Sequence, residues 1–284
     1  MVRTEAGERW VQANGLRVHV WDWGGAGRPI VLLHGLASNA RIWDFVAERL
    51  AASARVVAVD QRGHGLTAGP ERGYGFEETS ADLLELLHGL GFERPVIAGH
   101  SWGANVAVEF AVRHPEAPAG LVLVDGAVFT PRDNFPAWED AERRMAPPRI
   151  AGVRREDLLQ RMRSGDLGEF WRPELEPVIM AGFEDHGDGT VSPRLTFERH
   201  MQIVRALWET DTRSHLADVS CPVLLLPALR GEAEATRRKH EGVEAALRLL
   251  KRGQVEWLED SVHDVPLQRP ERVSEALTRF VAQV

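Results

Sequence analysis

The chain has 284 residues, 44% of them hydrophobic and 27% charged, as in an ordinary soluble globular protein of one large α/β domain or two small domains. Its 34 basic and 42 acidic residues give a net charge of −8, and without a basic run this balance argues against binding to nucleic acid or an anionic membrane. The single cysteine, Cys221, excludes an internal disulfide and any multi-cysteine metal site.

The N-terminal residues do not resemble a secretion signal. The first ten, MVRTEAGERW, carry charges where a signal peptide needs an apolar stretch. No apolar run reaches the length that spans a membrane. We therefore expect a cytoplasmic protein.

The first part of the chain alternates between apolar strands and amphipathic helices. Asn14-Gly15 divides the strand-like run 9–24 and predicts a hairpin, because a type I′ turn needs positive φ at both central residues. Continuous apolar runs predict strands buried on both faces at 28–35, 54–60, 95–98 and 120–124. Helical spacing predicts helices at 40–50, 77–91 and 104–114. This alternation predicts a parallel sheet covered by helices on both sides.

The alternation stops over residues 127–217, hereafter the insertion. Seven prolines cut this stretch into short pieces that carry scattered aromatic and charged residues, which we interpret as a helical insertion. The α/β pattern then resumes, with strands expected at 222–227 and 254–258 and helices at 234–252 and 271–284. The expected organisation is a core of residues 1–126 and 218–284, interrupted by a helical cap of residues 127–217.

A candidate nucleophile lies in the sequence Gly99-His100-Ser101-Trp102-Gly103. This G-x-S-x-G follows an apolar strand and precedes a helix, which is the setting of a nucleophile elbow. The two glycines allow neighbouring backbone to approach a sharp turn without a Cβ clash. We predict that Ser101 is the nucleophile; the alternative is an ordinary serine in a glycine-rich turn.

A serine hydroxyl needs a base to take its proton at neutral pH. His263 lies five residues beyond Leu258, where the last predicted strand ends, and is the preferred candidate. The histidines before Ser101 or within the insertion fit less well. His100 adjoins Ser101, and neighbouring side chains at such a turn point apart.

A carboxylate must orient the imidazole of His263. Asp125 directly follows the strand 120–124 and preserves the chain order of serine, acid and histidine. The loop after the strand 222–227 contains no aspartate, and Glu234 and Glu232 are the alternative acids there. We favour Asp125 over Glu234 and Glu232.

Two fixed donors must stabilise the oxyanion that develops during acyl transfer. The backbone N–H of Trp102 directly follows the nucleophile at the start of a helix, where the helix dipole favours negative charge. The second expected donor is the N–H of Leu36, which follows His34-Gly35 after the strand 28–35.

Together these motifs resemble the α/β-hydrolase superfamily over nearly the whole chain. The resemblance implies an eight-stranded sheet whose second strand is antiparallel, with a cap inserted after strand six. It also implies that Ser101 is the nucleophile, that His263 is the base, and that Leu36 and Trp102 donate to the oxyanion. The matching segments are IVLLHGLASNARIWD (30–44), VVAVDQRGHGLT (56–67), VIAGHSWGANVAVEFAVRHPE (96–116), GLVLVDGA (120–127) and SVHDVPLQRPERV (261–273).

The chain departs from this family pattern at the acid, because no aspartate follows the seventh strand. Some members place the acid after the sixth strand, as Asp125 would be. For the turn Asp60–Gly65, the resemblance suggests a structural rather than a catalytic role.

The expected activity is hydrolysis of small to medium apolar carboxylic esters through an acyl-enzyme, without a metal or an organic cofactor. Dehalogenases and epoxide hydrolases of this fold need a carboxylate where Ser101 stands. Lactonase, amidase, aminopeptidase, carbon–carbon hydrolase and cofactor-free peroxidase chemistry remain alternatives, as does a non-catalytic ligand-binding protein. The expected partner is a small-molecule ester, and the sequence predicts no particular oligomeric state. Candidate pocket residues are His34, Trp138, Phe170, Trp171 and Trp208. For the aromatic residues of the insertion, packing in the core between cap and sheet is the stronger interpretation.

Overall fold

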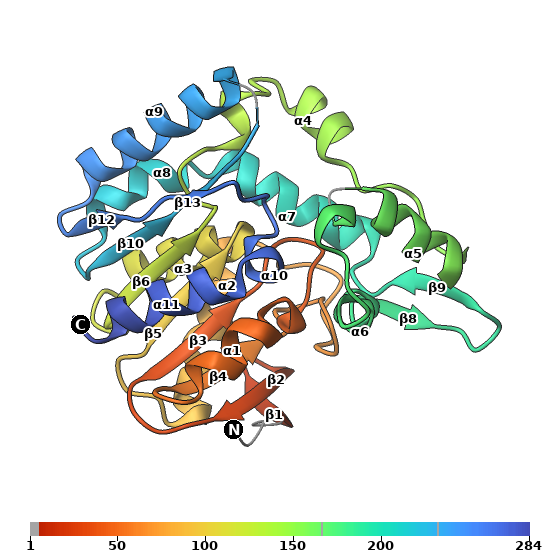
Figure 1. Ribbon diagram of the computed structural model, residues 1–284, viewed down its shortest axis with the longest axis horizontal. Helices are drawn as coiled ribbons and strands as arrows, with labels where there is room; N and C mark the ends of the chain where they lie inside the picture. The colour runs from red at the N-terminus through yellow and green to blue at the C-terminus, as the bar shows by residue number, and fades with distance from the viewer. Residues whose placement is uncertain (1–5, 166, 232) are drawn as a thin grey trace.

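The computed structural model describes residues 6–165, 167–231 and 233–284. Its centre is an eight-stranded sheet, which confirms the predicted α/β-hydrolase fold (Figure 1). Strand β2 pairs antiparallel with both neighbours, whereas the pairs from β4 to β12 are parallel. The spatial order is β1 (Gly7–Ala13), β2 (Leu16–Gly24), β4 (Arg55–Val59), β3 (Pro29–Leu33), β5 (Val96–His100), β6 (Gly120–Val124), β10 (Val223–Leu226) and β12 (Gly253–Val255).

The first two strands form the predicted hairpin. Asn14 and Gly15 have φ values of 48° and 74°, as the tight turn requires. Because Asn tolerates this left-handed region and Gly has no Cβ, the turn forms at low cost in strain.

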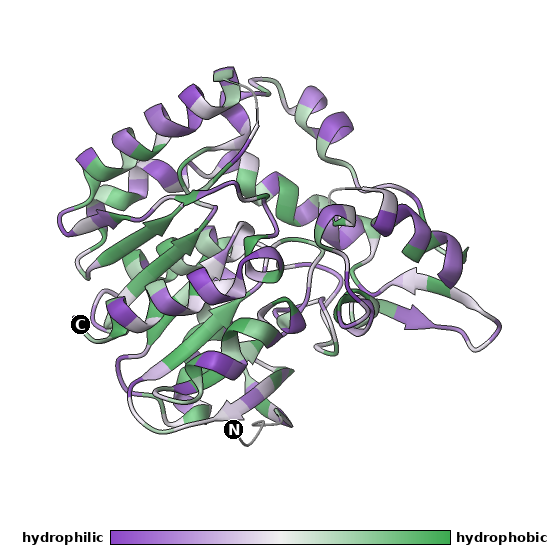
Figure 2. Ribbon diagram, viewed as in Figure 1, coloured by the Kyte–Doolittle hydropathy of each residue, from purple (hydrophilic) through white to green (hydrophobic). Residues whose placement is uncertain are grey.

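The central strands are apolar along their whole length because both faces of the sheet are covered. In β3, Val31 and Leu33 enter one hydrophobic cluster, whereas Ile30 and Leu32 enter the cluster on the opposite face. Figure 2 shows the result as uninterrupted hydrophobic strands beneath helices with one hydrophilic side. The sheet therefore has two cores, one on each face.

Six helices cover these two faces in the described core. One face carries α2 (Phe76–Leu90), α3 (Trp102–Arg113) and α9 (Ala233–Leu249), and the other carries α1 (Asp44–Leu50), α10 (Val265–Gln268) and α11 (Pro270–Val281). A 3₁₀ turn, η1 (Ala40–Trp43), leads into α1. Proline at the start of α11 favours a new helix there because its φ is already helical.

The last predicted strand, 254–258, divides into two pieces. Its first part is β12, while β13 (Leu258–Glu259) pairs with β11 (Ala228–Leu229) in a separate two-stranded sheet. Pro227 lies between β10 and β11 and has no N–H to donate to a ladder. The pair of β11 and β13 therefore lies outside the ladder of the main sheet.

The insertion contains the expected helices and, in addition, a small sheet that was not predicted. Strands β7, β9 and β8 form a small antiparallel sheet beside the helices (Figure 1). Gly187 and Gly189, with φ of 78° and 85°, make the turn between β8 and β9. The elements are η2 (Pro131–Asp133), α4 (Trp138–Met145), β7 (Val153–Arg154), α5 (Arg155–Ser164), η3 (Gly168–Phe170), α6 (Leu175–Met180), β8 (Phe183–Asp185), β9 (Thr190–Pro193), α7 (Phe197–Glu209), α8 (Thr212–His215) and η4 (Leu216–Asp218).

The insertion contacts the core through specific polar groups. Asn39, before η1, donates its side-chain N–H to Val178 O in α6 at 2.9 Å. His215 in α8 bonds the buried carboxylate of Glu109 in α3 at 2.7 Å. Among the described helices, none is long and apolar enough to cross a bilayer.

Candidate active site

Ser101 occupies a strained turn between β5 and α3. Its φ of 53° and ψ of −119° lie outside the regions that most residues adopt. A Cβ on Gly99 would lie 2.1 Å from Gly103 O, and a Cβ on Gly103 would lie 2.5 Å from Leu33 O. Glycine at both positions therefore permits the close backbone approach that holds Ser101 at the end of the strand.

Three side chains from distant parts of the chain form a continuous hydrogen-bonded row at this edge of the sheet. His263 Nε2 lies 3.0 Å from Ser101 Oγ, and His263 Nδ1 lies 2.7 Å from Asp125 Oδ2. Ser101 and Asp125 follow the adjacent parallel strands β5 and β6, whose carboxyl ends meet at one edge. The imidazole comes from the loop between β13 and α10.

The His263 loop is fixed by its backbone. Asp260 begins the loop at a φ of 53°, and Val262 N–H donates to Gln268 Oε1 at 2.8 Å. His100 Nε2–H donates to the carbonyl oxygen of His263 at 2.8 Å. Because a carbonyl only accepts, this bond also fixes the proton of His100 on Nε2.

His100 is a contributor that the sequence reasoning missed. Its side chain reaches the backbone of the loop that carries His263. Burial, with the positive charge of His263 adding to it, lowers the pKa of His100 to about 3, so it stays a neutral donor. Its position next to Ser101 in the motif was the available signal.

Asp125 is held in one orientation by three donors in addition to its own backbone. Its φ is 45°, a conformation that Asp adopts more readily than most residues. While Oδ2 accepts from His263, Oδ1 accepts from Ala228 N–H at 3.0 Å and from Lys239 Nζ at 2.8 Å. The carboxylate is therefore fully engaged, with its side chain only 7% exposed.

The structure separates the candidate acids. Glu234 lies in the first turn of α9, where its carboxylate bonds Arg237 at 2.7 Å and faces solvent. Glu232 lies outside the described residues. Asp125 is the carboxylate that the structure places against the imidazole of His263.

The electrostatics of this row favour an ionised acid beside a basic imidazole. Burial alone would raise the pKa of Asp125, but the hydrogen bond from His263 and the charge of Lys239 outweigh it and lower the pKa. Partial desolvation of the imidazole of His263 opposes its charged form, but the hydrogen bond and charge of Asp125 raise its pKa above the ordinary value. The carboxylate thus stabilises the imidazolium.

The two backbone N–H groups expected to face the oxyanion flank Ser101. Neither Leu36 N–H nor Trp102 N–H has a protein acceptor within the described part of the chain. The backbone before Leu36 packs directly on the serine, since a Cβ on Gly35 would lie 3.1 Å from Ser101 Cβ. Trp102 begins α3 directly after Ser101, so the positive end of the helix dipole lies at the serine.

The loop 34–37 is anchored by the turn Asp60–Gly65. Gln61 N–H donates to His34 Nε2 at 3.1 Å, and Ala37 N–H donates to His64 Nε2 at 3.2 Å. Asp60 is buried and accepts from Ala40 N–H at 2.7 Å. These bonds give the turn a structural role, as the resemblance suggested. They also occupy His34, a predicted pocket residue, which is completely buried.

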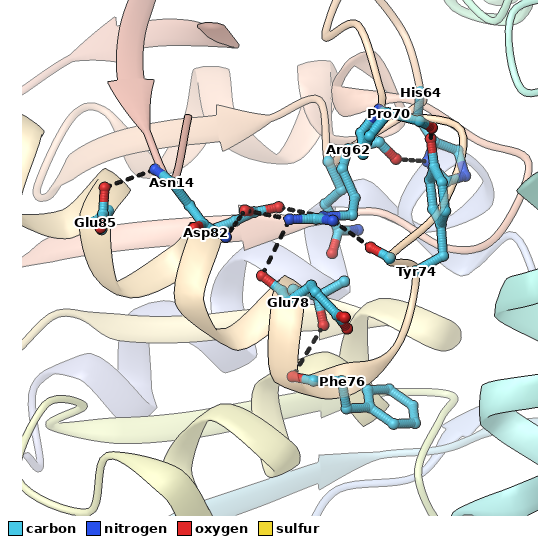
Figure 3. A network of polar contacts seen from close by, with 12 residues as sticks. Asn14, Arg62, His64, Pro70, Tyr74, Phe76, Glu78, Asp82 and Glu85 are labelled. Carbon is cyan, nitrogen blue, oxygen red and sulfur yellow. Dashed lines mark hydrogen bonds and ion pairs between the residues drawn. The ribbon is translucent and has the colours of Figure 1, made fainter. Parts of the chain in front are cut away.

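The same turn is tied to α2 by a buried ion pair. Arg62 bonds both oxygens of Asp82, at 2.5 and 2.6 Å, and also donates to Gly73 O (Figure 3). In Figure 3, Asp82 meets Asn14 of the hairpin as well, and the Asn14–Asp82 bond is 2.9 Å. The turn that supports the loop 34–37 is thereby linked to α2 and to the hairpin of β1 and β2.

A cavity of about 530 Å³ opens beside this loop, between the core and the insertion. Its core side consists of Ala37, Ser38, His64 and Gly65. Burial lowers the pKa of His64 and that of His200, the two histidines that line the cavity, so neither side chain carries charge at neutral pH. The insertion supplies mainly apolar groups, including Pro147, Pro148, Ile150, Ala151, Met162, Phe183, Pro193, Leu195 and Phe197, together with His200.

The four aromatic residues predicted for the pocket do not line this cavity. Trp138 and Trp208 pack edge to face, with ring centroids 5.7 Å apart, between α4 and α7. Phe170 packs against the hydrophobic cluster on the α1 face of the sheet. Trp171 lies beneath the guanidinium of Arg163. Aromatic composition indicated the right segment but could not show which side chains faced inward.

Comparison with known proteins identifies the family. The model of the α/β hydrolase family matches residues 30–276. The chain is 30% identical to N-formylmaleamate deformylase from Pseudomonas putida over 265 residues, which are 90% of this chain and 89% of that protein.

Two solved structures share the fold. E-2-(acetamidomethylene)succinate hydrolase superposes with a TM-score of 0.79 at 23% identity, covering 98% of this chain and 100% of that one. A thermophilic esterase from Thermogutta terrifontis gives a TM-score of 0.73 at 23% identity, covering 98% of both chains. The match to the family model and the 30% identity to the deformylase show that the chain belongs to the α/β hydrolase family of hydrolytic enzymes.

Proposed function

We propose that the chain is a serine hydrolase that cleaves carboxylic esters carrying a small to medium apolar group. The observation that carries this proposal is the row of Ser101, His263 and Asp125, joined at 3.0 and 2.7 Å. This is the arrangement in which an imidazole activates a hydroxyl and a carboxylate orients the imidazole.

In the proposed reaction, Ser101 Oγ attacks the ester carbonyl carbon while His263 Nε2 accepts its proton. Asp125 holds the Nδ1 proton and stabilises the imidazolium that forms. His263 then returns the proton to the leaving alkoxide. A water that His263 deprotonates hydrolyses the acyl-enzyme, and the imidazole side chain, 56% exposed, is accessible to solvent for this step.

The negative charge of the tetrahedral intermediate is assigned to the N–H groups of Leu36 and Trp102. Their lack of a protein acceptor in the described chain supports this role. Fixed donors of this kind need little reorganisation as charge develops, and loss of one typically costs about 10²–10³ in kcat.

The cavity beside Ala37 is the proposed seat of the apolar acyl or alcohol group. Its volume of about 530 Å³ is typical of a small-molecule site, and its lining offers few charged groups. We assign the insertion, residues 127–217, as the cap that completes this cavity over the core.

The direct test is a panel of p-nitrophenyl esters with acyl chains from acetate to decanoate, assayed on the purified protein. We expect measurable hydrolysis with a preference for short to medium chains, and stoichiometric labelling of Ser101 by a fluorophosphonate probe. Absence of both turnover and labelling in folded protein would favour a non-catalytic ligand-binding role.

Amide hydrolysis is a second candidate. It is favoured by the 30% identity, over most of both chains, to a protein named N-formylmaleamate deformylase. An amide would follow the same acyl-enzyme route, with His263 protonating a leaving nitrogen. Assays of N-formyl and N-acyl amides beside the matched esters distinguish amide hydrolysis from ester hydrolysis. The class with the higher kcat/KM is the preferred substrate.

A further inference from the structure

A lysine closes a ring of hydrogen bonds behind Asp125. Lys239 Nζ in α9 donates to Asp125 Oδ1 at 2.8 Å and to Ala228 O at 2.7 Å. Ala228 N–H in turn donates to the same carboxylate oxygen at 3.0 Å. The oxygen that does not face His263 is thus bound twice, by groups from α9 and β11.

Lysine suits this position better than arginine. Of the 34 basic residues in the chain only Lys239 and Lys251 are lysines. An ammonium is a compact charge with donors that can meet two converging oxygens, whereas the planar guanidinium is larger and donates in a fixed fork. The Lys239 side chain is 28% exposed, so its charge is only partly screened.

Charged groups and one neutral histidine surround the imidazole of His263. Asp125 and Lys239 approach from β6 and α9, His100 approaches from β5, and Asp264 adjoins it in the loop. Glu169 and Arg230 line the same side of the site, where they bond each other at 2.6 and 2.8 Å.

We propose that Lys239 is a positioning residue for the proposed hydrolysis: it fixes the Asp125 carboxylate with Oδ2 toward His263 and weakens the hold of that carboxylate on an imidazolium proton. Without Lys239, Ala228 N–H still binds Oδ1 and Oδ2 still accepts from His263, but the lysine charge no longer offsets the charge of the carboxylate. This inference rests on the proposed function, because it assigns Lys239 a role in that reaction.

The expected direction follows from the charges. Burial and the charge of Lys239 both act to lower the pKa of His263, against the raising effect of Asp125. Removing the lysine charge therefore raises the pKa of His263. Each unit of increase reduces the neutral, base-competent fraction roughly tenfold at a pH below that pKa.

The test compares Lys239→Met with Lys251→Met, which removes the other lysine from an exposed turn. The primary readout is the pKa of His263 from an NMR titration of the full chain, assigned with a His263→Gln variant. We expect an upward shift in Lys239→Met alone, with a three- to tenfold loss of kcat/KM near pH 6 on the best ester. In Lys239→Arg, which keeps the positive charge, the pKa of His263 should stay closer to its value in the unmodified protein.

The NMR titration does not depend on ester hydrolysis, so a failed substrate assignment and a failed role for Lys239 give different results. An unchanged or lowered pKa of His263 in Lys239→Met overturns the inference. So does a loss of kcat that is equal at every pH. If Lys239→Met does not fold, Lys239→Gln replaces it, and unfolding of both shows that the lysine is purely structural and also overturns the inference.

Discussion

The loops that carry Ser101, Asp125 and His263 contrast with the insertion that faces them. Ser101 and Asp125 follow completely buried strands and are held at positive φ values of 53° and 45°. In the insertion, α4 buries Ala141 alone, and α5 is joined to α6 by the ion pair of Arg155 and Glu176, whose side chains are 42% and 32% exposed. Exposed ion pairs contribute little to stability, typically 0–1 kcal/mol.

This difference indicates a division of labour. Dense backbone packing around the strand ends can hold side chains within hydrogen-bonding distance of one another. The more exposed insertion supplies most of the apolar cavity wall, where changes of size are easier to accommodate. We therefore expect substitutions in the loops to affect the chemical step and substitutions in the insertion to affect substrate preference.

The largest expected effect is that of Ser101→Ala. It removes the proposed nucleophile while leaving the backbone turn possible, so kcat for p-nitrophenyl esters should fall roughly 10⁴-fold or more. Stopped-assay kinetics measure the loss, and circular dichroism checks that the fold is intact. Turnover equal to that of the parent protein would eliminate the serine mechanism.

Asp125→Asn should come next. The amide is neutral and can present an N–H to His263, which favours the wrong tautomer, so a loss of about 10⁴ in kcat is expected. Glu234→Gln is the matched control and should leave kcat within about twofold, because Glu234 contacts Arg237 on the surface. A larger loss of kcat in Glu234→Gln than in Asp125→Asn would instead identify Glu234 of α9 as the catalytic acid.

The pH profile tests the basicity of His263. Because Asp125 raises the pKa of His263 above its ordinary value of 6.5, kcat/KM should fall as the pH drops through a midpoint above 6.5. Below that midpoint the loss approaches tenfold per pH unit, since only the neutral imidazole accepts a proton. A midpoint well below 6.5 would contradict the raised basicity of the site.

The smallest effect should come from the insertion. Phe183→Ala enlarges the cavity wall and should shift the preference among acyl or alcohol chain lengths toward longer groups by roughly tenfold in relative kcat/KM. Trp138→Ala is the control, since Trp138 packs on Trp208 and not in the cavity lining. An equal shift in both variants would place the substrate group outside the cavity beside Ala37.

Much of the architecture could be predicted because the relevant signals are local. The Asn14-Gly15 hairpin and the strand-forming apolar runs depend on residues within a few positions of each other, and the structure contains them. The small sheet of β7, β8 and β9 was missed because its strands are only two to four residues long and lack clear alternation.

The sequence by itself determined the sheet, the turn at Ser101 and a short set of candidate partners, since each follows from side-chain periodicity or backbone sterics along one segment. Only the tertiary structure decided that Asp125 rather than Glu234 meets His263, that Lys239 binds the back of that carboxylate, and that His100 holds the loop of His263. These contacts join residues 114 to 163 positions apart. Such pairs are set by how strands and helices pack in space, which no local pattern in the chain records.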